Sequence, residues 1–513
     1  MRKLPIGVRP FEKLNLSNRT KEISYQCSVL FLTYISYIGY HMARKSLSIV
    51  KTSEKFVNCS STICSSWITE LDDKSENAAM TTLGLLDTTY LVTYAIFVFV
   101  IGPVAERVDL RIFLTIGMLG TGIMNILFGL AYSTGIHSIW YFVAIQILFG
   151  MFQTTGWPGV LSVVANWFGN GKRGLIMGVW HSHTSIGNIL GAVVAGIFAA
   201  DNWGLSFIVP GLIMVIIGVI IFFFLVPDPS IVGLAHERYQ QLESTHSSKS
   251  SSSSSITKLM ENAKSCSDLT TSDFECEPLV PQKDQAIGFI EAFKIPGVVE
   301  YSVCLFFANL VGDTFMYWLP NLIYDTTNLD AASSANLSTV FDVGGIVGAV
   351  LAGLLFDWSR MGATTSSAMF LLSIPSLFIY QYLQADWCPI IENDGSPIFN
   401  TCYALNVSLL LVNGVFINGP FALIMTAVAA DLGTHPSLRG SKNALATVIA
   451  IINGAASIGS AVGPSITGWL ADGEDWGNVF TMMIVADTLA ALLLGRIVVQ
   501  EVRNKWMSKN IFD

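Results

Sequence analysis

"SIGNILGAVVAG" at residues 185–196 recurs as "SIGSAVGPSITG" at residues 457–468, with serine, isoleucine and three glycines at the same spacing. Glycines at helical spacing allow neighbouring helices to approach closely. A second echo places Gly102, Glu106, Arg107 and Arg111 in positions that correspond to Gly353, Asp357 and Arg360. The two echoes predict a chain built from two similar halves that follow one another in the sequence.

The composition assigns the chain to a membrane. Its 513 residues are 52% hydrophobic and only 13% charged, and the mean hydropathy is +0.55, which is too apolar for a water-soluble globule. The net charge of −9 and the lack of a stripe of lysines and arginines argue against nucleic-acid binding. The expected partner of the surface is therefore the lipid bilayer.

Twelve apolar windows are long enough for a helix to cross about 30 Å of hydrocarbon. They lie at residues 24–50, 80–103, 110–132, 138–167, 173–199, 205–226, 296–319, 335–356, 365–385, 403–430, 443–470 and 478–498. The first window is too long for the core of a signal peptide and has no small-residue cleavage pattern after it. We therefore expect an all-α membrane protein with twelve transmembrane helices.

The twelve windows divide around a polar region that contains "SSKSSSSSS" and has too little apolar surface to fold. The predicted organisation is an N-terminal tail, a six-helix half, a disordered linker, a second six-helix half and a C-terminal tail; these parts span residues 1–23, 24–226, 227–295, 296–498 and 499–513. Two parallel six-helix repeats are typical of transporters, whose substrate site lies near the middle of the membrane between the repeats.

The cations predict the orientation, because short cytoplasmic loops collect lysine and arginine. Of the 28 such residues, 23 fall on one side of the predicted bundle and three on the other, which places both termini in the cytoplasm. Arg44 and Lys45 belong to neither side. On the opposite face, Asn58 begins a glycosylation sequon, and four cysteines could form disulfides within their own loops (Cys59, Cys64, Cys388 and Cys402).

The stretch "GPVAERVDLR" resembles the loop signature of the major facilitator superfamily. Within that superfamily, "YHMARKSLSIVK", "QTTGWPGVLSVVANWFGNGKRGLIMGVWHSHTSIGNILG", "FDVGGIVGAVLAG", "NGPFALIMTAVAADLGTH" and "WGNVF" resemble the animal sugar-phosphate exchangers. The resemblance implies exchange of a sugar phosphate, first of all glucose 6-phosphate, for inorganic phosphate by rocking of the two halves, without a cofactor. It also implies that charged residues brace the cytoplasmic helix ends during gating, namely Glu106, Arg107, Arg111, Asp357 and Arg360.

Arg44 is the expected phosphate ligand. An arginine at the centre of a membrane helix costs about 2.5–3.5 kcal/mol on insertion scales, so it needs a partner. A phosphate dianion supplies one through paired, charge-assisted hydrogen bonds. The resemblance places the family's first-helix arginine on Arg44, with Lys45 beside it; adjacent helical residues point about 100° apart. On spacing alone, both cations could instead anchor at the lipid headgroups.

Further substrate-binding candidates follow from helical spacing and from the resemblance. Tyr37, His41 and Arg44 share one helix face, and so do Gln153 and Trp157, for which ordinary packing is the alternative. His181 is preferred over His183, although a histidine satisfied between helices remains open. In the seventh span Asn309 replaces the lysine of the relatives, and Asp313 and Tyr317 follow it.

The sequence also allows functions other than sugar-phosphate exchange. Buried acids at Asp87, Asp313, Asp342 and Asp487 could form a proton relay with His41 or His181, so a proton-coupled carrier of a sugar or organic anion is the alternative. A non-transporting receptor fits the glycine repeats less well. No motif of an enzyme or of a metal site is present. The resemblance favours an intracellular membrane, first of all the endoplasmic reticulum, and "ECEPLV" suggests an endolysosomal address as the alternative; the sequence does not predict the oligomeric state.

Overall fold

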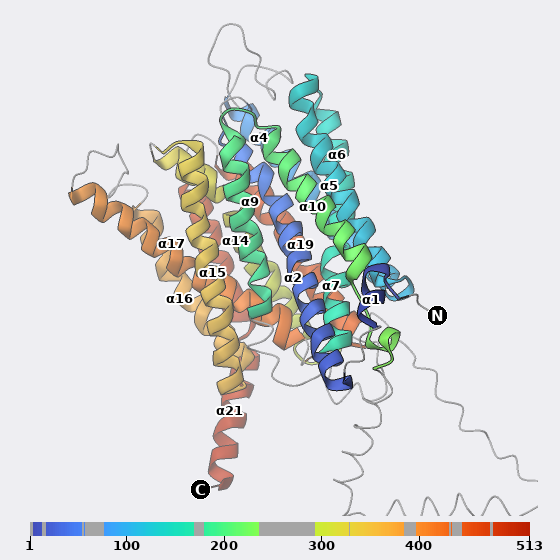
Figure 1. The fold of residues 1–513 in the computed structure, drawn as a ribbon. Coiled ribbons are helices and arrows are strands. Elements are labelled where there is room, and N and C mark those ends of the chain that lie inside the picture. Colours follow the sequence, from blue (N-terminus) through green and yellow to red (C-terminus); the bar gives the residue numbers. More distant parts are fainter. Residues whose placement is uncertain are drawn as a thin grey trace, which may run out of the picture.

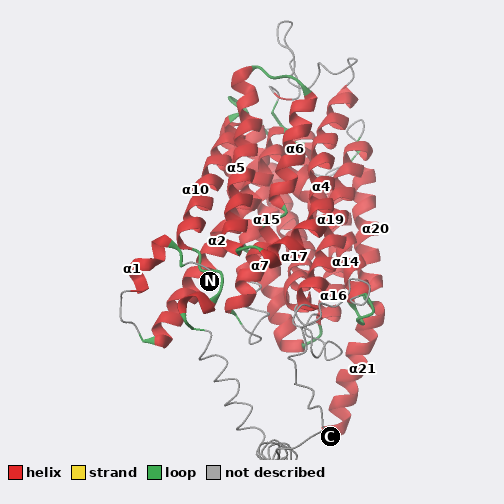
Figure 2. Ribbon diagram, turned by 90° about the vertical axis from the view of Figure 1, so that its right-hand side faces the viewer, coloured by secondary structure: helices red, strands yellow, loops and turns green. Residues whose placement is uncertain are grey.

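The structure is a computed structural model that describes residues 4–12, 17–53, 56, 76–168, 179–234, 293–327, 329–383, 397–429, 432, 444–471 and 476–512. Within these ranges the chain forms helices and no strands. Figures 1 and 2 show a long bundle whose helices run roughly side by side. We call the end at which α2 begins the lower end and the opposite one the upper end, as they appear in Figure 1.

The first half contains α2 (Asn18–Val50), α4 (Glu76–Arg107), α5 (Leu110–Thr134), α6 (Ile139–Gln153), α7 (Gly156–Trp167), α9 (His183–Ala199) and α10 (Leu205–Phe224). The second half contains α14 (Val298–Thr326), α15 (Ala331–Ser359), α16 (Gly362–Tyr382), α17 (Pro397–Leu423), α19 (Ala444–Leu470), α20 (Gly477–Leu493) and α21 (Gly495–Phe512). Short elements flank the first half: η1 (Ile6–Val8), α1 (Arg9–Glu12) and η3 (Pro229–Val232). A π-helical turn, η5 (Ile424–Val428), continues α17.

Each of the twelve predicted windows contains a helix or a pair of helices. The window at 138–167 is divided into α6 and α7, because Pro158 has no amide hydrogen to donate to the preceding turn. Nine of the described helical segments pass a test of length and apolarity for crossing a membrane, and one bent helix pair would make ten. The first span, α2, is not among the nine; its tyrosines, its histidine and its four cations (Arg19, Lys21, Arg44 and Lys45) lower its hydropathy.

Glycines set the closest helix contacts. A Cβ atom built on Gly344 of α15 would lie 2.1 Å from the carbonyl oxygen of Leu411 of α17, and one built on Gly414 would lie 2.0 Å from the carbonyl oxygen of Phe341. No side chain fits at either position, so α15 and α17 are packed backbone to backbone.

The two halves meet at the upper end. The α4–α19, α9–α15 and α2–α14 pairs pack across the boundary between them. Near the upper end the hydroxyls of Thr88 (α4) and Ser465 (α19) are hydrogen-bonded at 2.7 Å, and a Cβ atom on Gly196 (α9) would touch Ala335 (α15) at 3.4 Å. These contacts close the bundle above its centre.

Polar contacts hold the chain ends to the lower part of the bundle. Lys21 donates to Glu12 at 2.7 Å, and the hydroxyl of Tyr25 donates to the same carboxylate at 2.7 Å. Partial burial opposes ionisation of Glu12, but these two donors and the charge of Lys21 outweigh it and lower the pKa of the carboxyl below its usual value. At the other terminus, Glu501 of α21 accepts hydrogen bonds from the backbone amides of Ala363 and Thr364, which caps the first turn of α16.

Candidate functional site: a polar cavity between the two halves

A cavity lies at the boundary between the halves, in the middle of the bundle. It holds about 910 Å³ of unfilled space, open solvent included. Its walls come from α2, α4, α7 and α9 of the first half and from α14, α15, α17, η5 and α19 of the second, with His181 just before α9. The lining continues from Arg44 toward the lower end through His181, Phe421 and Met425. The position agrees with the expectation of a site between the repeats near the midplane.

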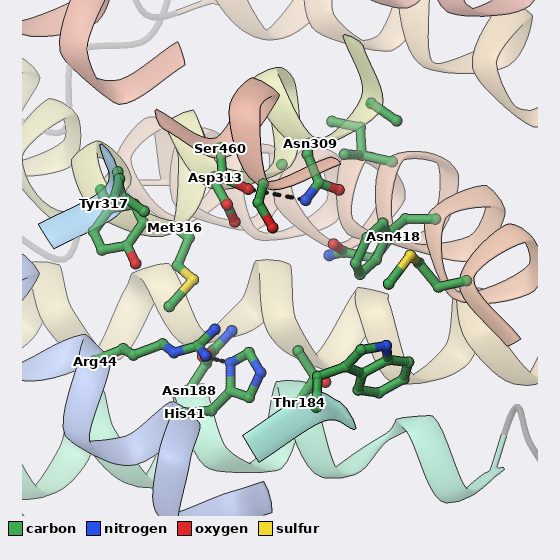
Figure 3. A pocket seen from close by; sticks show the side chains of 18 of the residues that line it. His41, Arg44, Thr184, Asn188, Asn309, Asp313, Met316, Tyr317, Asn418 and Ser460 are labelled. Atoms are coloured by element: carbon green, nitrogen blue, oxygen red, sulfur yellow. Dashed lines mark hydrogen bonds between the residues drawn. The ribbon is translucent and has the colours of Figure 1, made fainter. Parts of the chain in front are cut away.

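Arg44 projects from α2 into this cavity (Figure 3). Its Nε donates a 2.8 Å hydrogen bond to Oε1 of Gln153, and the amide nitrogen of Gln153 in turn donates to the carbonyl oxygen of Tyr40 at 3.3 Å, which fixes the orientation of the amide. The guanidinium carbon lies 5.0 Å from the centre of the Tyr94 ring. Nη2 is buried and has no hydrogen-bond partner among the described residues. The guanidinium is thus held from one edge, with donors left for an anion.

A cluster of aromatic side chains lines the same cavity as Arg44. The ring of Tyr37 lies 5.1 Å from that of His41 and 5.5 Å from that of Trp157, measured between centroids. All three residues line the cavity. The face shared by Tyr37, His41 and Arg44, which helical spacing predicts, therefore points inward, and Trp157 joins it from α7.

A chain of hydrogen bonds crosses from one half to the other beside Arg44. Nδ2 of Asn188 (α9) donates to Oδ1 of Asp342 (α15) at 2.8 Å, and Oδ1 of Asn188 lies 3.2 Å from Nδ1 of His41. Because the amide nitrogen is used by Asp342, the amide oxygen accepts, so the proton of His41 sits on Nδ1. Nε2 of a neutral His41 is then a hydrogen-bond acceptor.

His181, just before α9, and His183, the first residue of α9, lie in different places. His181 lines the cavity, with its ring 6.0 Å from that of Trp157. His183 is not part of the lining; it is fully buried against Tyr37 and Trp180, both at 4.5 Å between ring centroids. Thr184, which follows His183, also lines the cavity.

The second half contributes a wall of neutral and acidic groups. Asn309 donates to Ser460 of α19 at 2.9 Å, and Asp313 and Tyr317 follow on the same helix (Figure 3). Asn418 of α17 completes this wall. Among the described lining residues the single lysine or arginine is Arg44, whereas two carboxylates, Asp313 and Asp342, face it from the second half.

Lys45 points elsewhere. It is 2% exposed, is not among the lining residues, and its ammonium donates a 2.7 Å hydrogen bond to the carbonyl oxygen of Met316. Lys51 is also buried and forms an ion pair with Asp87 of α4. The adjacent cations of the sequence thus diverge, one to the cavity and one to the backbone of α14.

Several lining residues were not among the substrate-binding candidates from the sequence, although Asp342 was considered there as part of a proton relay. Tyr90 and Tyr94 of α4 flank Arg44, and Asn188, Asp342, Asn418 and Ser460 supply the polar groups described above. Asn188 and Ser460 occupy the same position of the two "SIG" repeats, which is a signal that the sequence did contain.

Three of the predicted gating residues, Arg111, Asp357 and Arg360, are not among the described residues that line the cavity. The guanidinium carbon of Arg111 lies 5.6 Å from the centre of the Phe222 ring, and Arg360 ends α15 with a left-handed backbone (φ 57°). The side chains of Glu106 and Arg107 are outside the described part of the structure, as are Asn58, Cys59, Cys64, Cys388 and residues 235–292 of the linker predicted at 227–295. Asp357 lies in the last turn of α15, and Cys402 forms a disulfide bond.

A bundle of apolar helices in two halves, with a polar cavity between them, defines a membrane transporter of the alternating-access kind. The family model described as Major Facilitator Superfamily matches residues 33–441, and the chain belongs to this superfamily. It is accordingly a transporter and not an enzyme, as the sequence predicts.

Several relatives cover nearly the whole chain. The glucose-6-phosphate exchanger SLC37A2 of Bos taurus is 44% identical over 94% of this chain and 95% of its own, and that of Homo sapiens is 44% identical over 92% of each. The putative glycerol-3-phosphate transporter 1 of Arabidopsis thaliana is 41% identical over 98% of this chain and 94% of its own. These matches confirm the resemblance to sugar-phosphate exchangers.

A solved structure of a bacterial homologue of the human lysosomal transporter Spinster, in an inward-facing and unoccupied conformation, has a similar fold. Its TM-score is 0.54 at 13% sequence identity, over 93% of this chain and 95% of that chain. At this identity the likeness supports the fold alone.

Proposed function

We propose that this protein exchanges a sugar phosphate, first of all glucose 6-phosphate, for inorganic phosphate across a membrane. The names of the relatives support the class of substrate. The observation that carries the proposal is the guanidinium of Arg44, which reaches the cavity with Nη2 buried and unpartnered among the described residues. A phosphoryl group offers the acceptor oxygens that such a guanidinium lacks.

In this proposal the phosphoryl group lies on the wall of the first half. Arg44 binds it, Gln153 holds the guanidinium from behind, and Tyr37, His41, Trp157 and His181 shape the wall around it. Lys45 supports the positive potential without acting as a direct ligand, because its ammonium is hydrogen-bonded to the backbone of α14. Glu106, Arg107, Arg111, Asp357 and Arg360 act at the helix ends during gating.

The sugar lies against the second half. Asn309 and Tyr317 offer neutral donors and acceptors, and the carboxylate of Asp313 accepts hydrogen bonds from hydroxyl groups. A carboxylate on this wall repels a second phosphoryl group, so a single-phosphate ester with free hydroxyls suits the cavity.

The test uses liposomes loaded with inorganic phosphate and labelled glucose 6-phosphate added outside. We expect uptake that requires internal phosphate, is abolished in Arg44→Ala, and is only partly restored in Arg44→Lys, which keeps the charge but not the planar fork. Arg496→Ala is the matched control, because it removes an arginine whose side chain is 60% exposed and remote from the cavity lining. Uptake that persists in Arg44→Ala would refute the proposal.

A second candidate, a proton-coupled carrier, is favoured by the two carboxylates of the lining, Asp313 and Asp342. It predicts uptake that follows an imposed pH gradient without internal phosphate and that is lost in Asp313→Asn. The same liposomes, emptied of phosphate, distinguish the two functions.

For the location we propose an intracellular membrane, the endoplasmic reticulum first, with both termini in the cytoplasm and Asn58 glycosylated on the opposite face. The distribution of lysine and arginine supports this orientation. Imaging of a tagged chain with markers for the endoplasmic reticulum and lysosomes, together with digestion of the glycan in wild type and Asn58→Gln, tests both statements.

A further inference from the structure

Pro320 lies inside α14, close to its upper end. Proline has no amide hydrogen, so the carbonyl oxygen four residues earlier, that of Met316, loses its normal partner in the helix. In a membrane interior such a carbonyl must find a donor from another element. The sequence of α14 therefore creates one acceptor that its own helix does not satisfy.

The donors come from the other half of the protein. The ammonium of Lys45 and the hydroxyl of Ser48, both on α2, donate to the Met316 carbonyl at 2.7 and 3.0 Å. The side chain of Lys45 is 2% exposed and that of Ser48 is fully buried. A hydrogen bond from a charged donor in such surroundings is stronger than an ordinary one.

Lys51, which directly follows α2 and lies about two helical turns beyond Lys45, also contacts α14. Its ammonium lies 3.4 Å from the carbonyl oxygen of Tyr317 and 3.9 Å from the centre of the Trp318 ring. The ion pair with Asp87, which belongs to the same half as Lys51, keeps this cation in place. Lys45 and Ser48 of α2, together with Lys51 directly after it, thus contact three consecutive residues of α14.

Two of these three residues of α14, Met316 and Tyr317, also line the cavity. A molecule in the cavity and the donors of α2 therefore act on the same turn of α14 (Figure 3). The contact lies toward the upper end, where α4 meets α19 and α9 meets α15.

We propose that Lys45, Ser48 and the Met316 carbonyl freed by Pro320 form a clasp that keeps the upper end closed and must break whenever the cavity opens upward. Lys45 is then a gating residue, although it stands next to the phosphate ligand in the sequence. The clasp does not depend on which substrate is carried, so its test is independent of the proposed exchange.

The experiment measures the distance between spin labels at the upper end, on Ser133→Cys at the exposed end of α5 and Asn336→Cys on α15, in purified protein without substrate. The chain without the two cysteines gives the background from native thiols. We expect one short distance in the parent, and in Lys45→Met a second, longer distance whose ratio to the first rises by about tenfold or more, as the loss of a charge-assisted hydrogen bond implies.

One milder variant and its matched control keep the test valid even if Lys45→Met does not fold. Ser48→Ala removes one neutral donor and should shift the ratio in the same direction by less. Its matched control is Ser36→Ala, since Ser36 is equally buried on α2 but donates to Leu32 of its own helix. An unchanged distribution in Ser48→Ala and Lys45→Met, or an equal shift in Ser36→Ala, would overturn the proposal.

Pro320→Ala tests the origin of the acceptor. Alanine restores an amide hydrogen for the Met316 carbonyl, so it should raise the longer-distance population with α2 intact. It should also remove most of the further effect of Lys45→Met, because the two variants break the same contact. Full additivity of the two variants would show that Lys45 acts through another group.

Discussion

Replacing Lys51 with methionine leaves the carboxylate of Asp87 alone in the interior of the bundle. The side chains of the pair are 0% and 1% exposed; Lys51 contacts Oδ2 of Asp87, and Oδ1 has no hydrogen-bond partner among the described residues. Removing one member of a buried pair typically costs about 3–5 kcal/mol, because the remaining group must stay charged without a partner or take up a proton. Lys51→Met should therefore destabilise the protein by about that amount.

The double variant Lys51→Met/Asp87→Leu separates the ion pair from packing. Replacing both members with apolar groups of similar volume is often neutral or stabilising, so we expect the double variant to recover most of the lost stability. The assay is thermal unfolding in one detergent, followed by tryptophan fluorescence. A cost below about 1 kcal/mol for Lys51→Met, or a double variant less stable than either single one, would refute the reasoning.

Three further predictions concern single contacts. Gln153→Ala should leave the guanidinium of Arg44 in the cavity but misoriented, and weaken substrate affinity by roughly tenfold without abolishing transport, measured as the concentration dependence of uptake. Gly414→Val should reduce the yield of folded protein sharply on size-exclusion chromatography, because its side chain would overlap the backbone of α15, whereas Gly495→Ala, which meets nothing within 4 Å, should not. Glu501→Gln should weaken the attachment of α21 by about 1–3 kcal/mol and speed its removal by limited proteolysis, with Arg503→Gln on the same helix as control.

The helices of the bundle were predictable because a bilayer requires long apolar segments, and each predicted window contains a helix. The break between α6 and α7 was less visible, since the whole window is apolar and a single proline decides where it divides. The C-terminal end of α14 also extends beyond the prediction, to Thr326; Leu322 and Ile323 are buried there, and Asn321 donates a hydrogen bond to Asp325 within the helix.

The candidate site was likewise predictable only in part from the sequence. Helical spacing placed Tyr37, His41 and Arg44 on one face, and the structure brings all three to the cavity. The direction of Lys45 could not be predicted from α2 alone, because its partner is a carbonyl about 270 residues later that is free only because of Pro320. Contacts between halves depend on tertiary packing, which local patterns do not encode.

The charges of the cavity bear on its response to voltage. One arginine faces two carboxylates, so a bound phosphate ester adds two negative charges to a lining that the single cation does not neutralise. A carrier that returned empty would move those two charges in one direction, and each charge is worth about 2.3 kcal/mol per 100 mV of membrane potential. One-for-one exchange of two dianions moves equal charge both ways, so the membrane potential of the organelle would change neither the direction nor the equilibrium of the proposed exchange.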